Sequence, residues 1–183
     1  MKILALDFET ADYQADSACA LGLAMIEDGQ IVRSHTVLIR PPRRWFKFTY
    51  IHGITWDDVK DKPTFGEQWS ELEEWFDEAD YLVAHNAPFD RGVLTACCAA
   101  AGVRPPQKPF LCTVRLSRSL WQLRPAKLPN VCEYFGIQLN HHDAGSDTLA
   151  CARIMIHALR SIAESGLVPA DHLHRFALKD RGA

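Results

Sequence analysis

The stretch LALDFET, residues 4–10, is an apolar run that ends in two carboxylates separated by one aromatic residue. Continuous apolar runs of this length are typical of buried strands. Because alternate residues of a strand point to the same face, we expect Asp7 and Glu9 to project together while Phe8 packs on the opposite face. Two carboxylates this close repel unless a cation lies between them, which predicts a site for a hard divalent ion. Taken alone, the stretch also fits a strand that ends with both side chains in solvent.

The pattern around this strand predicts an antiparallel meander followed by alternating helices and strands. An Asp28-Gly29 pair between two apolar runs is a strong hairpin signal, and Trp69, Leu72 and Phe76 recur at helical spacing. This order predicts an α/β domain with a mixed sheet and flanking helices. Strands are expected at 3–8, 19–26, 31–39, 81–85 and 110–112, and helices around 69–79 and at 88–101, 114–123, 129–136 and 144–165.

The length of 183 residues favours one domain, which we place at 1–165, followed by a tail at 166–183 that packs on the domain or docks to a partner. The apolar run after Lys2 stops at Asp7, so it does not read as a signal peptide, and no run is long enough to span a membrane. We therefore expect a soluble, cytoplasmic protein. The six cysteines include no Cys-x-x-Cys pair and are expected to be buried free thiols.

The net charge of −3 conceals a strong asymmetry along the chain. Residues 57–80 hold ten acids against two lysines, whereas no acid occurs between Asp90 and Glu133. Such a chain can present a positive face to a polyanion, although a lopsided solvated surface is the simpler reading. The cations of the acid-free segment are Arg91, Arg104, Lys108, Arg115, Arg118, Arg124 and Lys127.

A second candidate acid, Asp90, lies in HNAPFD, residues 85–90, at the junction of a predicted strand and helix. In α/β sheets, ligands bind at such carboxyl ends of strands. The alternative is that Asp90 only complements the dipole of the helix that Pro88 opens.

A third candidate site is HDAGSD, residues 142–147, at the start of the last long helix. A histidine before the helix can meet the carboxylate of Asp147 in its first turn. Alternatively, Asp143 or Ser146 caps the helix and both histidines lie on the surface. A zinc site that uses His141 and His142 is disfavoured because adjacent residues rarely ligate one tetrahedral ion.

Together, DFET (7–10), HNAPFD (85–90) and HDAGSD (142–147) resemble, in type and order, the motifs of the DnaQ-like (DEDDh) family of 3′–5′ exonucleases. The family also includes the proofreading subunit of bacterial replicative DNA polymerase. YIHGIT (50–55) is similar to the family segment that borders the terminal nucleotide. The resemblance extends over about residues 3–160 and implies an RNase H-like fold.

The resemblance implies that Asp7, Glu9, Asp90 and Asp147 hold two divalent ions, Mg²⁺ or Mn²⁺, and that His142 is the general base. This agrees with the chemistry, since two cations can balance both reacting oxygens of an anionic phosphodiester. An imidazole can accept a proton near neutral pH.

By the same resemblance, the backbone of Thr10 and Ala11 approaches the 3′-terminal sugar, while Ile51, His52 and Phe89 pack around the last base. For Phe89, a core position under the helix start is the alternative. The segment RPPRRWFKFTY (40–50) alternates cations with aromatics, which suits a single strand, or it is a mobile loop with one or two aromatics packed inward. Arg115, Arg118 and Lys127 are expected along the same path.

The leading hypothesis is therefore a 3′–5′ exonuclease that releases nucleoside 5′-monophosphates from single-stranded or frayed DNA ends. An RNA-trimming enzyme of the same superfamily is the closest alternative, because nothing in the motifs distinguishes the two sugars. A non-catalytic module that binds nucleic acid or a polymerase is the third. A polymerase or clamp partner is compatible with the first and last of these.

Overall fold

A five-stranded sheet in the order β3-β2-β1-β4-β5 forms the centre of the computed structural model, which describes residues 1–179. The strands β1, β2 and β3 pair antiparallel, whereas β1 pairs with β4 and β4 with β5 in parallel. The predicted mixed sheet is therefore confirmed. The strands are β1 (Lys2–Thr10), β2 (Ala18–Glu27), β3 (Gln30–Leu38), β4 (Tyr81–Ala84) and β5 (Phe110–Cys112).

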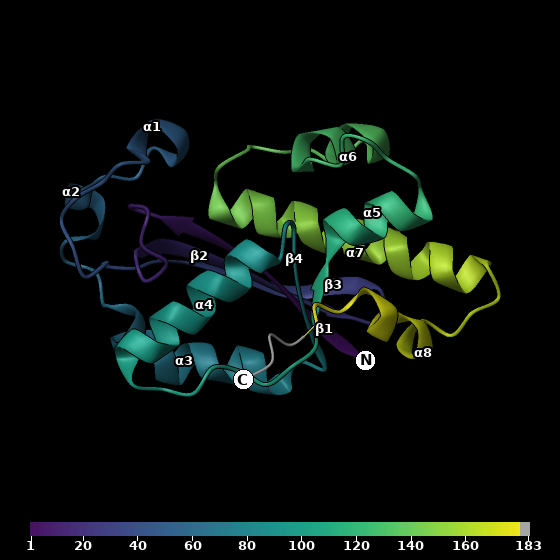
Figure 1. Cartoon of the computed structure of the whole chain (residues 1–183), viewed down its shortest axis with the longest axis horizontal. Coiled ribbons are helices and arrows are strands. Elements are labelled where there is room, and N and C mark those ends of the chain that lie inside the picture. Colours follow the sequence, from purple (N-terminus) through teal and green to yellow (C-terminus); the bar gives the residue numbers. More distant parts are fainter. Residues whose placement is uncertain (180–183) are drawn as a thin grey trace.

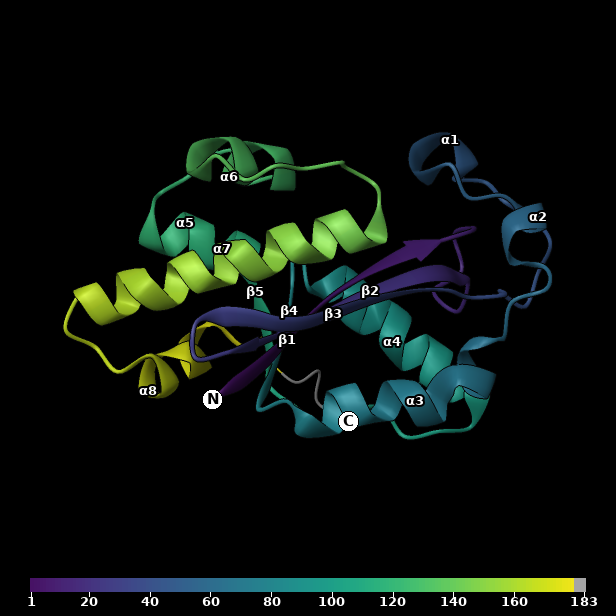
Figure 2. The same cartoon turned by 180° about the vertical axis from the view of Figure 1, so that it is seen from behind.

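Helices cover both faces of the sheet (Figure 1). On one face lie α3 and α4, and on the other lies α7, with α5 and α6 beside it; the view from behind shows the same layers (Figure 2). The helices are α1 (Thr49–His52), α2 (Trp56–Val59), α3 (Phe65–Glu78), α4 (Pro88–Ala101), α5 (Thr113–Leu120), α6 (Leu128–Phe135), α7 (Ala144–Glu164) and α8 (Pro169–Leu173).

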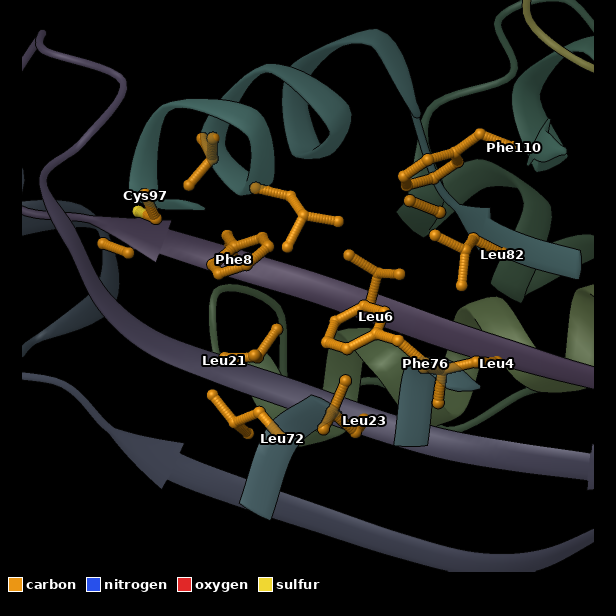
Figure 3. Packing of buried hydrophobic residues seen from close by; sticks show 14 of the residues in the cluster. Leu4, Leu6, Phe8, Leu21, Leu23, Leu72, Phe76, Leu82, Cys97 and Phe110 are labelled. Atoms are coloured by element: carbon orange, nitrogen blue, oxygen red, sulfur yellow. The ribbon is translucent and has the colours of Figure 1, made fainter. Parts of the chain in front are cut away.

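The alternation of side chains along β1 determines which residues meet which helix layer. Leu4, Leu6 and Phe8 belong to the core under α3 and α4, where they pack among leucines and aromatics of β2 and α3 (Figure 3). Ile3 and Ala5 belong to the second core, beneath α7. The same alternation continues to the carboxyl end of the strand, so its two acids follow Ile3 and Ala5 on the α7 side.

The hairpin between β2 and β3 uses the expected turn residues, with Asp28 at φ 49° and Gly29 at φ 73°. Positive φ at both central residues matches the turn type that follows the twist of a hairpin. Most helices also agree with the sequence pattern, but α5 spans Thr113–Leu120 rather than 114–123. The short helices α1, α2 and α8 were not predicted, since four or five residues are too few for an apolar stripe to show.

The segment after α7 packs onto the β5 edge of the sheet. Leu173 is fully buried, and the amide of Leu178 donates a hydrogen bond of 2.7 Å to the carbonyl of Phe110. Leu111 and Ala177 form an isolated antiparallel bridge. Leu167 and Val168, at the start of the tail, are 44% and 61% exposed. The assignment of 166–183 as a tail that packs or docks stays a prediction, and residues 180–183 lie outside the described part.

All six cysteines are buried and free, as expected. In the described part of the chain, no helix is both long and apolar enough to cross a bilayer.

Candidate active site

A cavity of about 880 Å³ opens at the carboxyl ends of β1 and β4. Its walls come from α1, the start of α4, α5, the loop before α6 and the start of α7. Figure 1 shows α1 and the start of α7 at the same end of the molecule. Asp7, Glu9, Asp147 and His142 all line the cavity, so the first and third sequence motifs meet here.

Three carboxylates form a compact group on the sheet side of this cavity. One ligand oxygen from each of Asp7, Glu9 and Asp147 lies within 4.8 Å of the other two. The side-chain atom Oδ1 of Asp147 is buried and has no hydrogen-bond partner among the described residues. An unpartnered buried carboxylate oxygen in an all-oxygen group fits a hard divalent cation.

The electrostatics of the group point the same way. Burial, followed by the charges of Asp90, Asp147 and Glu9, raises the pKa of Asp7 well above its usual value. Burial and the charge of Asp147 raise the pKa of Glu9 to about 8. These shifts show that the folded chain alone stabilises the carboxylate charges poorly, and a bound cation would reverse them.

Asp90 lies behind this group and does not line the cavity. Its side chain is 1% exposed, and its Oδ1 accepts a hydrogen bond of 3.1 Å from the amide of Phe8. Burial raises the pKa of Asp90 to about 8, even though this bond acts in the opposite direction. The side chain therefore joins the start of α4 to β1. The alternative, in which Asp90 only complements the dipole of α4, would not require this hydrogen bond. Its role as a fourth metal ligand stays a prediction.

The turn before α7 brings both histidines to Asp147. Atom Oδ2 of Asp147 accepts a hydrogen bond from the backbone amide of His142 at 3.1 Å and lies 2.8 Å from Nδ1 of His141. The two imidazole rings stack with centroids 3.8 Å apart. His142 has a left-handed φ of 68°, which turns its amide back towards the helix. Burial and the charge of His141 lower the pKa of His142, favouring a neutral imidazole.

The caps predicted for α7 are present, because Oδ1 of Asp143 accepts from the amide of Ser146 at 2.8 Å. Ligand atoms of His141, His142 and Asp147 also lie within 4.8 Å of one another, so the disfavoured site that uses both histidines is geometrically available. The left-handed turn brings both residues to one place, and no local sequence signal announces it. His141 is thus a site residue that sequence reasoning did not select.

Of the five expected substrate-binding residues, the structure brings four to the cavity: Thr10, Ile51, His52 and Phe89. Ala11 is fully buried outside it, and its amide and carbonyl are bonded to Ser17 O at 2.8 Å and Lys47 N at 2.7 Å. The strand register shifts between Glu9 and Thr10, which turns the chain away at this point.

His52 holds the rim through both ring nitrogens. Its Nδ1 accepts from the amide of Ile54 at 3.1 Å, so Nε2 carries the proton and donates to Thr10 O at 3.1 Å. Burial lowers the pKa of His52, in agreement with this neutral form.

The opposite wall of the cavity is basic. Arg118 and Lys127 line it, as expected, whereas Arg115 lies elsewhere, with Nη1 3.5 Å from the carbonyl of Ala177. His85 supports this wall: its Nδ1 lies 2.8 Å from Thr113 Oγ1 and its Nε2 lies 3.1 Å from Ala126 O. Burial lowers the pKa of His85 to about 4, so it is a neutral structural link rather than a charge.

Residues 4–155 match the RNase_T family, described as exonuclease. The chain belongs to this exonuclease family. It is 31% identical over 179 residues to a PolC-type DNA polymerase III of Thermotoga petrophila, covering 96% of this chain and 13% of that protein. The match to the PolC-type polymerase of Bacillus subtilis is 32% over 175 residues, covering 92% and 12%. The chain thus spans about one eighth of the length of these relatives.

Solved exonuclease structures share the fold. Exonuclease X, in complex with 5′ overhanging duplex DNA, has a TM-score of 0.76 at 24% identity, covering 95% of this chain and 98% of that chain. The nuclease domain of 3′hExo, a DEDDh member bound to rAMP, has a TM-score of 0.77 at 17% identity, covering 97% and 96%. The resemblance to DEDDh exonucleases and the RNase H-like fold is therefore confirmed.

In this exonuclease, two cations of the 40–50 segment form ion pairs with acids of other segments. Arg40 pairs with Glu67 at 3.3 Å, and Arg43 pairs with Asp12 at 2.9 Å and with Asp16. Both arginine side chains remain 38% exposed, so a strand-binding role for the 40–50 segment stays a prediction. Their partners lie 27 to 31 positions away in the sequence, so local spacing could not show the pairing.

Proposed function

We propose that this member of the exonuclease family hydrolyses the terminal phosphodiester at the 3′ end of single-stranded or frayed DNA. The observation that carries the proposal is the group formed by Asp7, Glu9 and Asp147, whose ligand oxygens lie within 4.8 Å of one another and include a carboxylate with an unpartnered Oδ1. Together with Asp90, these residues would hold two Mg²⁺ or Mn²⁺ ions. The ions would supply the positive charge that an anionic phosphodiester needs at its attacking and leaving oxygens.

His142 is the residue that takes the proton from the attacking water. Its ring lines the cavity, while Nδ1 of His141 is already engaged with Asp147. The water oxygen forms a bond to phosphorus as its proton moves to the imidazole of His142. The bond from phosphorus to the 3′-oxygen of the preceding nucleotide breaks, and that oxygen takes a proton from solvent. The products are a nucleoside 5′-monophosphate and a strand shortened by one residue with a free 3′-hydroxyl.

The remaining walls bind and orient the strand. Ile51 and Phe89 present partly exposed apolar surface to the cavity, where they can pack around the last base. Arg118 and Lys127 face the same space from the other side, where their charges can meet the phosphates. The acids lie on the sheet side of the cavity and the cations lie on the other side. The cations can attract the phosphates of a strand whose scissile phosphate has to reach metal ions held by the carboxylates.

The test compares the wild type with Asp7→Asn, which is close to isosteric. We expect the wild type to degrade a 3′-labelled oligonucleotide with Mg²⁺ or Mn²⁺, and expect chelation by EDTA or the substitution to abolish this. Titration calorimetry with Mn²⁺ should show binding that Asp7→Asn weakens. Full turnover in Asp7→Asn would contradict the metal site.

The choice between DNA and RNA requires parallel assays. The rate of digestion is measured on DNA and RNA oligonucleotides of the same sequence and ends. Faster digestion of DNA supports the DNA exonuclease, and faster digestion of RNA supports the RNA-trimming alternative. The PolC-type relatives suggest a separate experiment on partners. The chain is mixed with a replicative polymerase or a sliding clamp, and complex formation is measured by gel filtration.

A further inference from the structure

Two exposed aromatic side chains stand outside the cavity in line with its rim. The side chain of Tyr13 is 69% exposed and that of Trp45 is 57% exposed. The ring of Tyr13 meets Phe48 edge to face at 4.9 Å and lies 6.4 Å from the ring of Trp45. Because Phe48 lines the cavity, the three rings form a continuous row from the cavity wall outward.

The two loops that carry these rings are fixed to each other. Arg43 forms ion pairs with Asp12, at 2.9 Å, and with Asp16, and the side chain of Asp12 is only 1% exposed. The carbonyl of Ala11 accepts from the amide of Lys47 at 2.7 Å. The exposed rings are thus held by partly buried ion pairs and by a backbone hydrogen bond between their loops, so they are presented on a preorganised surface.

The aromatic character of the row indicates which kind of ligand binds to it. A large aromatic side chain that is exposed to water loses the stabilisation that burial would give. A group of such side chains on a surface therefore indicates a binding site for a flat, apolar ligand group. Nucleobases stack on aromatic rings with little regard to sequence. Lys47 comes from the same loop as Trp45 and offers a charge for the accompanying phosphates, whereas the guanidinium of Arg44 lies 5.4 Å from the ring centroid of Trp56. Because Phe48 both lines the cavity and contacts Tyr13, a strand that leaves the cavity on this side would meet Tyr13 next.

We propose that Tyr13 and Trp45, continuous with Phe48, form a stacking platform for the bases that precede the terminal nucleotide of a single strand. The proposal rests on the proposed function, which places the 3′ end in the cavity. Single-stranded DNA and RNA both present stacking bases, so either could occupy the platform. A substrate long enough to reach the platform should have a higher kcat/KM than one that ends at the scissile bond.

The test uses the full chain with Tyr13→Ala and Trp45→Ala combined, and Tyr134→Ala as the matched control. Tyr134 lies on α6 and is 57% exposed, like Trp45, but it is outside the cavity lining. We measure kcat/KM for a dinucleotide and a 12-mer, each as DNA and as RNA. The double variant should lose roughly 10- to 100-fold on the 12-mer relative to the dinucleotide, mainly through KM. The control should keep the wild-type ratio.

A selective loss in either sugar arm supports the platform and identifies the strand that uses it. An unchanged ratio in both arms, or equal losses on dinucleotide and 12-mer, overturns it. If the wild type cleaves neither substrate, the proposed function fails, and the platform is then tested by fluorescence anisotropy of a labelled 12-mer in EDTA. There, weaker binding by the double variant than by Tyr134→Ala supports the platform, and equal binding overturns it.

Discussion

Gly22 lies directly opposite Asp7 in the β1–β2 pair, and the start of α7 lies directly over it. A Cβ added at Gly22 would stand 2.3 Å from the carbonyl oxygen of Ala144 and 2.3 Å from Oγ1 of Thr148. Such distances are far below van der Waals contact. The absence of a side chain at this one position lets α7 approach the sheet closely enough for Asp147 to join the two acids of β1.

The first prediction concerns this close approach. Gly22→Ala should push the start of α7 away from the sheet, destabilise the fold by roughly 1–3 kcal/mol through overpacking and strongly reduce nuclease activity. Thermal unfolding and oligonucleotide digestion measure both effects. Gly92→Ala is the matched control: a Cβ there meets nothing within 4 Å, and alanine in a helix should stabilise by about 1 kcal/mol. Equal behaviour of the two variants would contradict the packing argument.

The second prediction concerns repulsion among the metal-binding carboxylates. Because Asp7, Glu9 and Asp147 oppose one another, Mn²⁺ should raise the melting temperature of the wild type, with the logarithm of its concentration once the site is saturated. In EDTA, Asp7→Asn should be at least as stable as the wild type, since it removes one of the repelling charges. Differential scanning calorimetry with and without Mn²⁺ measures this. A variant that keeps the full Mn²⁺ shift would refute the assignment of Asp7 as a ligand.

The third prediction separates the two histidines. His142→Asn keeps a residue that tolerates left-handed φ and should lower kcat by about 10²–10⁴-fold through loss of the general base. It should retain the Mn²⁺-induced stabilisation. His141→Ala loses the contact with Asp147 and should cost less, about 10-fold, as expected for a supporting partner. Single-turnover rates provide the comparison, and a larger loss in His141→Ala would reverse the assignment.

The fourth prediction is a pH dependence of stability at the Arg43 ion pairs. Burial raises the pKa of Asp12, but the hydrogen bonds from Arg43 and Gln14 outweigh it, and Arg43 lowers the pKa of Asp16. A lowered carboxyl pKa stabilises the fold above the ordinary value near 3.8 and ceases to do so as pH falls through the lowered value.

Because the Arg43 side chain is 38% exposed and solvent screens its pairs, Arg43→Ala should cost about 1–2 kcal/mol at pH 7 and less as pH falls below ~4. Urea unfolding at pH 7 and pH 3 measures the difference. Lys60→Ala, which breaks an exposed pair with Asp57, should change stability by less than about 0.5 kcal/mol at either pH. A cost of Arg43→Ala that is the same at both pH values would exclude the carboxylates as its cause.

The sequence predicts the sheet side of the site well because a strand has a fixed period. Asp7 and Glu9 share a face by that period alone, and the start of α4 follows from Pro88. The features it missed depend on contacts distant in sequence or on single dihedral angles. The position of His141 follows from the left-handed turn at His142, and the pairing of Arg43 with Asp12 joins two loops.

Ala11 was expected at the site from its motif, but the structure buries it outside the cavity. Its neighbour Thr10 reaches the cavity, but a register shift at the end of β1 buries Ala11 and commits its backbone to Ser17 and Lys47. A motif predicts which residues are close in the chain. It does not predict which of two adjacent residues the turn leaves exposed.

The most direct test of the central claim is the digestion of a 5′-labelled single-stranded oligonucleotide by the wild type and by Asp7→Asn, with Mn²⁺ and with EDTA. A metal-dependent 3′–5′ exonuclease gives a ladder of labelled products that shorten one nucleotide at a time, with nucleoside 5′-monophosphates released, only for the wild type with metal. Release of the label first as a mononucleotide, or the same ladder from Asp7→Asn or in EDTA, would contradict it.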